Sequence, residues 1–227
     1  MAILSLSGVA VAISNQGAEK AKAPGLEKIE FIHWKKGFAK PETAKASKPP
    51  SCYKFLTPTK VKWTVLPVNY TINPTNSQNL DINLIKSAIF NGAEAWDTAI
   101  SKEVINDNYV VDYNVAYGVQ DYKNAVAFGN YPTAGVIAVT SVWYNPTTKA
   151  IAEFDMMFDK DWIWGDATAD QAIMDLQNIA THEFGHADIY DTACSSVTMY
   201  GYSDYGDTVK RTLETPDITG LRTLYGI

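Results

Sequence analysis

His182-Glu183-Phe184-Gly185-His186 is the stretch that decides how the rest of this 227-residue chain is interpreted. The two histidines lie four residues apart, so on a helix both imidazoles project from one face and can reach one metal ion at about 2.0–2.1 Å. Glu183 is rotated away from His186, which places its carboxylate near a metal-bound water instead of the metal. This H-E-x-x-H spacing predicts a zinc site with a glutamate as general base.

The residues around the motif favour a helix. Residues 170–186 contain no proline, Gly185 is their only glycine, and apolar side chains recur at helical intervals. The chain has three histidines, and two of them fall at ligand spacing. The alternative is a pair of surface histidines beside a solvated glutamate. We therefore expect His182 and His186 to bind zinc and Glu183 to be catalytic.

Segments beyond the motif carry a family resemblance. The run 182–187, then Thr198-Met199-Tyr200-Gly201, then residues 217–226 (DITGLRTLYG) resemble the metzincin zinc proteases, and within them the matrixins and related secreted prokaryotic peptidases. Residues 66–74 resemble their first strand, and the segment from residue 81 their first long helix. The resemblance implies an α+β fold, a twisted mixed β-sheet with an active-site helix, a backing helix and a C-terminal helix.

The third metal ligand departs from the family pattern. Metzincins continue as H-E-x-x-H-x-x-G-x-x-H, or with Asp last, but this chain has Ile189 and Thr192 at those two offsets. On a straight helix Asp188 would lie about 200° around from His186, whereas Asp191 could reach the metal if the helix breaks after His186. We take Asp191 as the third ligand. Asp188, which a four-residue deletion in the alignment would favour, and a site without a third protein ligand remain alternatives.

The resemblance also implies an activity. A zinc-dependent endopeptidase would polarise a water and the substrate carbonyl with Zn2+, while Glu183 takes the water's proton and passes it to the leaving amine. Met199 would lie beneath the metal, and Tyr200 and Tyr202 are candidates for the oxyanion or for packing. One alternative is a catalytically impaired pseudoprotease that acts as a peptide-binding scaffold. Another is a gluzincin-type site that uses Glu214.

Charge is distributed unevenly along the chain. Residues 1–62 carry a net charge of +7 and residues 63–227 a net charge of −13. A basic N-terminal unit facing an acidic domain is typical of a prosegment, although a solvated basic tail is an alternative. The acidic region argues against nucleic acid as a partner, and no apolar run is long enough to cross a membrane. We expect a monomer that acts on protein or peptide substrates.

Three regions follow from this pattern. Residues 1–14 are signal-peptide-like, which predicts secretion; the alternative is a cytosolic N-terminal segment. Residues 15–50 are a propeptide or basic linker with a strand-like island at 29–34, in which His33, among lysines, is expected at the surface. Residues 51–227 form the metzincin-like catalytic domain.

The two cysteines have one possible pairing. In an exported protein Cys52 and Cys194 are expected to form a disulfide between the start of the catalytic domain and the loop after the zinc helix. In the matrixins a prosegment cysteine ligates zinc and keeps the enzyme latent, so Cys52 is also a candidate for such a switch. Free thiols are the third option.

The remaining pattern predicts one more helix and the strands. Asp81 is a candidate N-cap for a helix to residue 100, and Thr215 for the last helix, with Pro216 and Asp217 in its first turn. Strand candidates are residues 61–72, 109–115, 125–128, 135–144 and 151–158. In the resembled fold an edge strand, here 135–141, pairs with an extended substrate. The aspartates at 155, 159, 161 and 166 are candidates for structural Ca2+ or, as we expect, for solvated turns.

Overall fold

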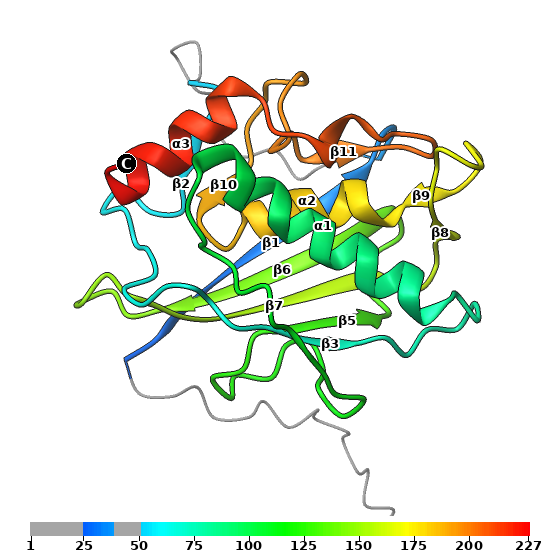
Figure 1. The fold of residues 1–227 in the computed structure, drawn as a ribbon, viewed down its shortest axis with the longest axis horizontal. Helices are drawn as coiled ribbons and strands as arrows, with labels where there is room; N and C mark the ends of the chain where they lie inside the picture. Colours follow the sequence, from blue (N-terminus) through cyan, green and yellow to red (C-terminus); the bar gives the residue numbers. More distant parts are fainter. Residues whose placement is uncertain (1–24, 39–50) are drawn as a thin grey trace, which may run out of the picture.

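The computed structural model describes residues 25–38 and 51–227, built around a mixed sheet of seven strands in the order β11-β1-β6-β7-β5-β3-β4. The α-helices in these residues are α1 (Ile82–Ile100), α2 (Leu176–Gly185) and α3 (Thr215–Tyr225). Figure 1 shows α1 and α2 side by side across one face of the sheet, with α3 beyond their ends. The α+β class with an active-site helix, a backing helix and a C-terminal helix is confirmed.

The strands of the main sheet alternate in direction only near its middle. β6 is antiparallel to both β1 and β7, whereas β5 is parallel to β7 and to β3, and β3 is parallel to β4. The strands are β1 (Glu27–Lys35), β3 (Thr71–Asn73), β4 (Val110–Val111), β5 (Ala125–Gly129), β6 (Val136–Tyr144), β7 (Ile151–Asp159) and β11 (Tyr202–Ser203). Two small sheets pair β2 (Lys54–Phe55) with β10 (Ile189–Tyr190) and β8 (Trp164–Gly165) with β9 (Met174–Asp175).

Helix α1 is the support on which α2 rests. It begins where the Asp81 carboxylate accepts hydrogen bonds from two backbone N–H groups of the first turn. The helices approach so closely at Gly92 that a Cβ there would lie 2.9 Å from the Cβ of Ala180. Near the same crossing, the Trp96 indole donates to the Thr181 carbonyl oxygen over 2.7 Å. These contacts fix the position of α2 between α1 and the sheet.

Several predicted boundaries were wrong, for tertiary reasons. Residues 61–72 do not form one strand: pairing begins at Thr71, and only isolated bridges precede it. Helix α2 begins at Leu176, because the carboxylate of Asp175 accepts from the Asn178 N–H at 2.7 Å and also binds Arg211. Helix α3 has Glu214 at its N-cap in place of Thr215.

The largest difference concerns the N-terminal strand. The island at 29–34 is part of β1, which inserts between β6 and β11 and pairs with β6 along nearly its whole length, from Glu27 opposite Tyr144 to Trp34 opposite Val136. The strand expected to be an open edge is therefore covered in this structure. Backbone donors and acceptors that could bind an extended peptide are already paired with β1.

The cysteine prediction is confirmed as a disulfide. Cys52 and Cys194 are joined, with their Cα atoms 5.5 Å apart. A cysteine held in a disulfide cannot ligate a metal, which rules out the switch alternative in this state. The signal-peptide-like segment 1–14 lies outside the described residues. Among the helices described, none combines the length and apolar character that a membrane span requires.

Candidate active site and metal centre

Three potential metal ligands converge at the end of α2. The Nε2 atoms of His182 and His186 lie 3.1 Å apart, and each lies 3.4 Å from Oδ1 of Asp191. Donor atoms at about 2.0–2.1 Å from a tetrahedral zinc are separated by about 3.3 Å. The spacing of the three atoms therefore matches a tetrahedral site with one position left for water or substrate.

The hydrogen bonds of the two imidazoles prepare them for a metal. His182 Nδ1 lies 2.7 Å from the Thr198 carbonyl oxygen, and His186 Nδ1 lies 3.1 Å from that of Ile189. A carbonyl only accepts, so each Nδ1 carries the hydrogen and each Nε2 presents its lone pair to the same point. Neutral imidazoles oriented by a second hydrogen bond are the form that binds zinc.

The chain turns back after His186 without the family's glycine. Helix α2 ends at Gly185, the next three N–H groups bond three residues back, and β10 then pairs with β2. This turn carries Asp191 back to the two histidines, while Asp188 accepts a hydrogen bond from the Tyr225 hydroxyl at 2.5 Å, towards α3. The structure thus places Asp191, and not Asp188, beside the imidazoles.

The environment of the two aspartates separates their charge states. Burial raises the pKa of Asp188 to about 7. Burial acts in the same direction on Asp191, yet the positive charge and donated hydrogen bonds of His186 and His182, when these rings are protonated, hold its pKa well below the usual value. An aspartate that stays ionised is the better metal ligand, because the carboxylate must be deprotonated to bind.

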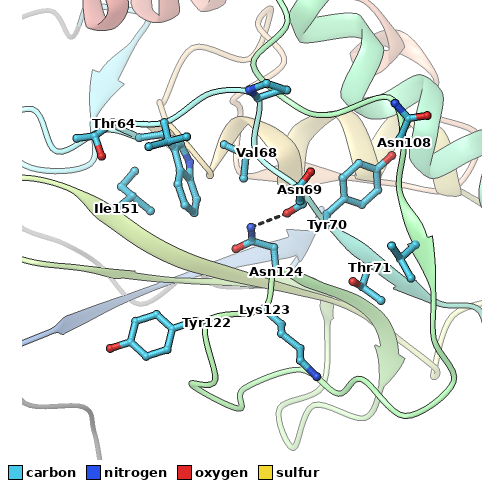
Figure 2. Close-up of a pocket in the computed structure, with 14 residues that line it drawn as sticks. Thr64, Val68, Asn69, Tyr70, Thr71, Asn108, Tyr122, Lys123, Asn124 and Ile151 are labelled. Atoms are coloured by element: carbon cyan, nitrogen blue, oxygen red, sulfur yellow. Dashed lines mark hydrogen bonds between the residues drawn. The ribbon is translucent and has the colours of Figure 1, made fainter.

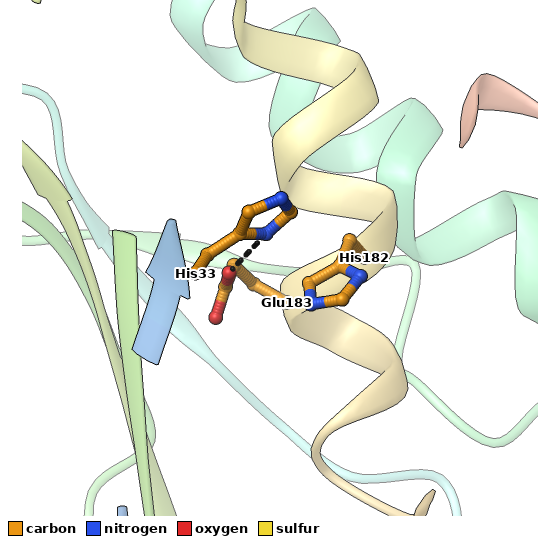
Figure 3. Close-up of side chains that lie close together, drawn as sticks. All are labelled: His33, His182 and Glu183. Carbon is orange, nitrogen blue, oxygen red and sulfur yellow. Dashed lines mark hydrogen bonds and ion pairs between the residues drawn. The ribbon is translucent and has the colours of Figure 1, made fainter. Parts of the chain in front are cut away.

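Glu183 lies next to this centre and contacts two other elements. Its Oε2 accepts from the Thr140 hydroxyl of β6 at 2.6 Å, and its Oε1 lies 3.0 Å from Nδ1 of His33. Burial raises the pKa of Glu183 to about 7, which suits a group that takes up and releases a proton near neutrality. Figure 3 shows the His33 ring extending from β1 to the Glu183 carboxylate beside His182.

The expectation that His33 lies at the surface was wrong. His33 is fully buried, its ring lies 4.0 Å from that of His182, and Phe31 on the same face of β1 stacks on His186 at 4.1 Å. Two side chains spaced two apart on a strand thus cover two histidines spaced four apart on a helix. Alternation in the sequence carried this signal, since His33 is in phase with the apolar residues Ile29 and Phe31.

Comparison with known proteins identifies the family to which this chain belongs. The sequence pattern of the matrixins matches residues 62–226, which includes the three potential ligands and Glu183. The chain belongs to the matrixin family. A relative is the hatching enzyme of Paracentrotus lividus, which is 29% identical over 163 residues. The matched segment makes up 70% of this chain and 25% of the hatching enzyme, so the chain spans about a quarter of that relative's length.

In this matrixin the turn at Met199 lies directly under the end of α2. A Cβ on Gly185 would lie 2.3 Å from Sδ of Met199 and 2.5 Å from the Trp96 ring, so only glycine fits between the two. The turn is held from the other side by Asp217, whose carboxylate accepts from the N–H groups of Thr198 and Met199. The contact between Gly185 and Met199 therefore fixes how closely the end of α2, which carries the two histidines, approaches this turn.

Other candidates in the matrixin domain have structural positions. Tyr200 and Tyr202 pack together with ring centroids 5.4 Å apart, and Glu214 lies at the start of α3. Asp155 and Asp159 are buried and accept backbone N–H groups, so the prediction of solvated turns was wrong for them. Among the described residues, the groups that could hold a metal do not include these two aspartates.

Away from the metal centre, the surface has a cavity of about 420 Å³ (Figure 2). Its walls come from the segment around Tyr70 and from the loop that contains Tyr122 and Asn124, where the Asn124 amide donates to the Asn69 carbonyl oxygen at 2.6 Å. None of the three potential ligands lines it, and neither does Glu183. This cavity is therefore not part of the metal centre.

Proposed function

We propose that this matrixin is a zinc-dependent endopeptidase, in which His182, His186 and Asp191 hold the metal and Glu183 is the general base. The observation that carries the proposal is the convergence of two imidazole nitrogens and one carboxylate oxygen within 3.1–3.4 Å of one another. Their donor set and spacing suit Zn2+, which takes three protein ligands in catalytic sites.

A zinc ion bound there would supply electrophilic activation of a water and of the peptide carbonyl. Glu183 does the proton transfer: it takes a proton from the attacking water and returns it to the leaving amine. The Thr140 hydroxyl, 2.6 Å from Oε2, orients the carboxylate and leaves Oε1 for a second partner. In the present structure that oxygen is occupied by His33.

We further propose that residues 15–50 are a prosegment and that the described state is latent. Strand β1 uses the hydrogen-bonding edge of β6 that a peptide substrate would need, and His33 engages the proposed base. The C-terminal end of β1 is fixed by ion pairs between the basic segment and the acidic domain. Lys35 pairs with Asp204 at 2.8 Å and Lys36 with Asp207 at 2.7 Å. Activity then requires that β1 leave the cleft.

Secretion and a monomeric state complete the proposal. The Cys52–Cys194 disulfide and the matrixin family support an oxidising, extracellular destination. Protein or peptide chains are the proposed substrates, without nucleic acid or membrane partners. Mass analysis of protein recovered from whole culture with its thiols blocked, with and without reduction, tests the compartment, because a cytosolic protein would carry two thiols.

The second candidate is a peptide-binding scaffold without catalysis. The covered edge of β6 favours it, because a strand that never leaves the cleft would prevent cleavage. The deciding experiment combines zinc stoichiometry with digestion of casein and N-terminal sequencing of the active species. One zinc per chain with casein cleavage, and a new N-terminus beyond β1, supports the peptidase. Bound zinc with no cleavage under any condition supports the scaffold.

A further inference from the structure

Within the cleft, the side chain of His33 fills a polar pocket next to Glu183. It is fully buried, and its Nε2 lies 3.0 Å from the Ser203 hydroxyl and 3.1 Å from Nζ of Lys210. Its Nδ1 faces Glu183. We call this space the His33 pocket, formed by His182, Glu183, Ser203 and Lys210.

The donors and acceptors in the His33 pocket can be assigned from their chemistry. A lysine ammonium only donates, so Nε2 of His33 accepts from Lys210. The ring hydrogen then lies on Nδ1 and is donated to the Glu183 carboxylate. The floor of the pocket therefore offers hydrogen-bond donors, from Lys210 and Ser203, to an acceptor atom at the tip of the inserted side chain.

Lys210 is an unusual residue to find at this depth. It lies on the short helix η1 (Val209–Arg211), is 4% exposed, and its ammonium contacts His33 Nε2 and the Tyr200 carbonyl oxygen. The salt bridges among the described residues do not include Lys210. Its direct partners are uncharged, and the carboxylates of Asp191, Glu183 and Asp207 act on it only from a longer distance. Burial of a cation without a direct ion pair is unfavourable, and a carboxylate from outside would supply one.

Lys210 also borders a second space, which His33 does not line. Lys210 lines a cavity of about 390 Å³ together with Lys36, Tyr200 and Tyr202; Asp207, which is paired with Lys36, and Glu214 are its acidic members. Glutamate has as many bonds between Cα and its terminal oxygens as histidine has between Cα and Nε2. Its carboxylate would therefore reach Lys210 and Ser203 instead of stopping beside Glu183.

We propose that the His33 pocket selects an acidic side chain, glutamate above all, from a peptide substrate, and that Lys210 determines this selectivity. That a peptide substrate enters the cleft rests on the proposed peptidase function. The position of the pocket rests on the geometry of β1. Strand β1 shows how an extended chain on β6 directs one side chain to Lys210. A substrate on the same edge would direct one of its own side chains there.

The first test uses the full chain and does not depend on activity. Position 33 is changed to Glu or to Leu in the zinc-loaded Glu183→Gln protein, which cannot cleave its own strand and lacks the opposing carboxylate. Hydrogen–deuterium exchange of the β1 amides reports how firmly the pocket holds each side chain. Because a charge-assisted hydrogen bond replaces an apolar contact, we expect exchange to be about tenfold slower with Glu than with Leu.

Matched variants assign that difference to Lys210. In a Lys210→Met background, which keeps an unbranched side chain one atom shorter and removes its charge, Leu at position 33 should be held as firmly as Glu or more firmly. Lys36→Met removes another lysine from the same cavity wall and should leave the preference for Glu intact. Equal exchange for Glu and Leu with Lys210 present, or a preference that survives Lys210→Met, overturns the inference.

The second test separates the inference from the proposed function. Peptides released from casein by the full chain are mapped by mass spectrometry, with Asp and Glu expected at one fixed position beside the cleaved bond. Lys210→Met should remove that enrichment from the peptides that are still released. Cleavage without acidic enrichment overturns the selectivity and leaves the peptidase proposal standing. No cleavage even after the N-terminal strand has been removed by limited proteolysis, with the Lys210-dependent preference for Glu at position 33, supports the pocket and overturns the peptidase.

Discussion

Helix α2 and strand β1 face each other across the metal centre, but they are held there in different ways. Helix α2 is buried against α1, with Gly92 and Gly185 at points where no larger residue fits. Strand β1 is held by backbone pairing with β6, by a two-residue pairing with β11, and by ion pairs at exposed lysines. Side-chain packing fixes α2 in the core, whereas the contacts of β1 are of a kind that another extended peptide can reproduce.

This contrast suggests how to distinguish the scaffold of the metal centre, which includes α2, from an occupant of the cleft, which is β1. Changes on α2 and in the turn after it should abolish metal binding, catalysis or folding. Changes on β1 should alter access to the cleft and leave the metal centre intact. The variants below test this division, beginning with the largest expected effect.

Asp191→Ala should produce the largest change on the α2 side. Loss of a direct ligand should weaken zinc binding by more than the 10–100-fold typical of an outer partner, so we expect about three orders of magnitude and no activity. Asp188→Ala is the matched control, because Asp188 contacts Tyr225 and not the histidines. Competition with a chromophoric zinc chelator measures the zinc affinity of both variants. Unchanged affinity in Asp191→Ala together with weaker binding in Asp188→Ala would reverse the assignment.

Glu183→Ala tests the base without removing a ligand. We expect kcat to fall by about 10²–10⁴-fold, the usual contribution of general acid–base catalysis, while zinc stoichiometry stays at the wild-type value. Casein hydrolysis and metal analysis on the same preparation give both quantities. Loss of zinc would make Glu183 a ligand, and full activity would refute its role as the base.

Gly185→Ala tests the close packing of the end of α2, which carries the histidines, against the turn at Met199. The new methyl group would meet Met199 and Trp96, so we expect the free energy of unfolding to fall by about 1–3 kcal/mol. Thermal unfolding measures this change, which should lower Tm by several degrees in a domain of this size. An unchanged Tm with wild-type zinc content would mean that the turn at Met199 can move away freely.

The division between α2 and β1 also marks what could be predicted from the sequence. The spacing of His182, Glu183 and His186 is local, so it could be recognised without knowing the fold. Asp191 required one more step, the inference that the helix breaks after His186. The sheet partners of β1 lie more than 100 residues away along the chain, and no local pattern encodes them.

The same reasoning explains the other errors. The start of α2 depends on Asp175 binding Arg211, a contact that periodicity does not report. Asp155 is buried because it accepts three N–H groups from residues 118, 119 and 125, which the sequence alone does not bring together. Lys210 carried no signal at all, since its neighbours in the chain give no indication that it is buried.

The smallest effect is expected on the β1 side, from His33→Ala in the full chain. This change removes the hydrogen bonds to Glu183 and Lys210 but none of the backbone pairing with β6. Each buried hydrogen bond contributes about 1 kcal/mol net, so loss of the two should let β1 open about 30-fold more often, and casein hydrolysis should rise by a similar factor. Lys28→Ala, at an exposed position of the same strand, is the control and should change little. Zinc affinity should stay the same in both variants, because neither residue is a ligand. A fall in activity or in zinc affinity on loss of His33 would show that β1 belongs to the working centre, and the distinction between scaffold and occupant would then fail.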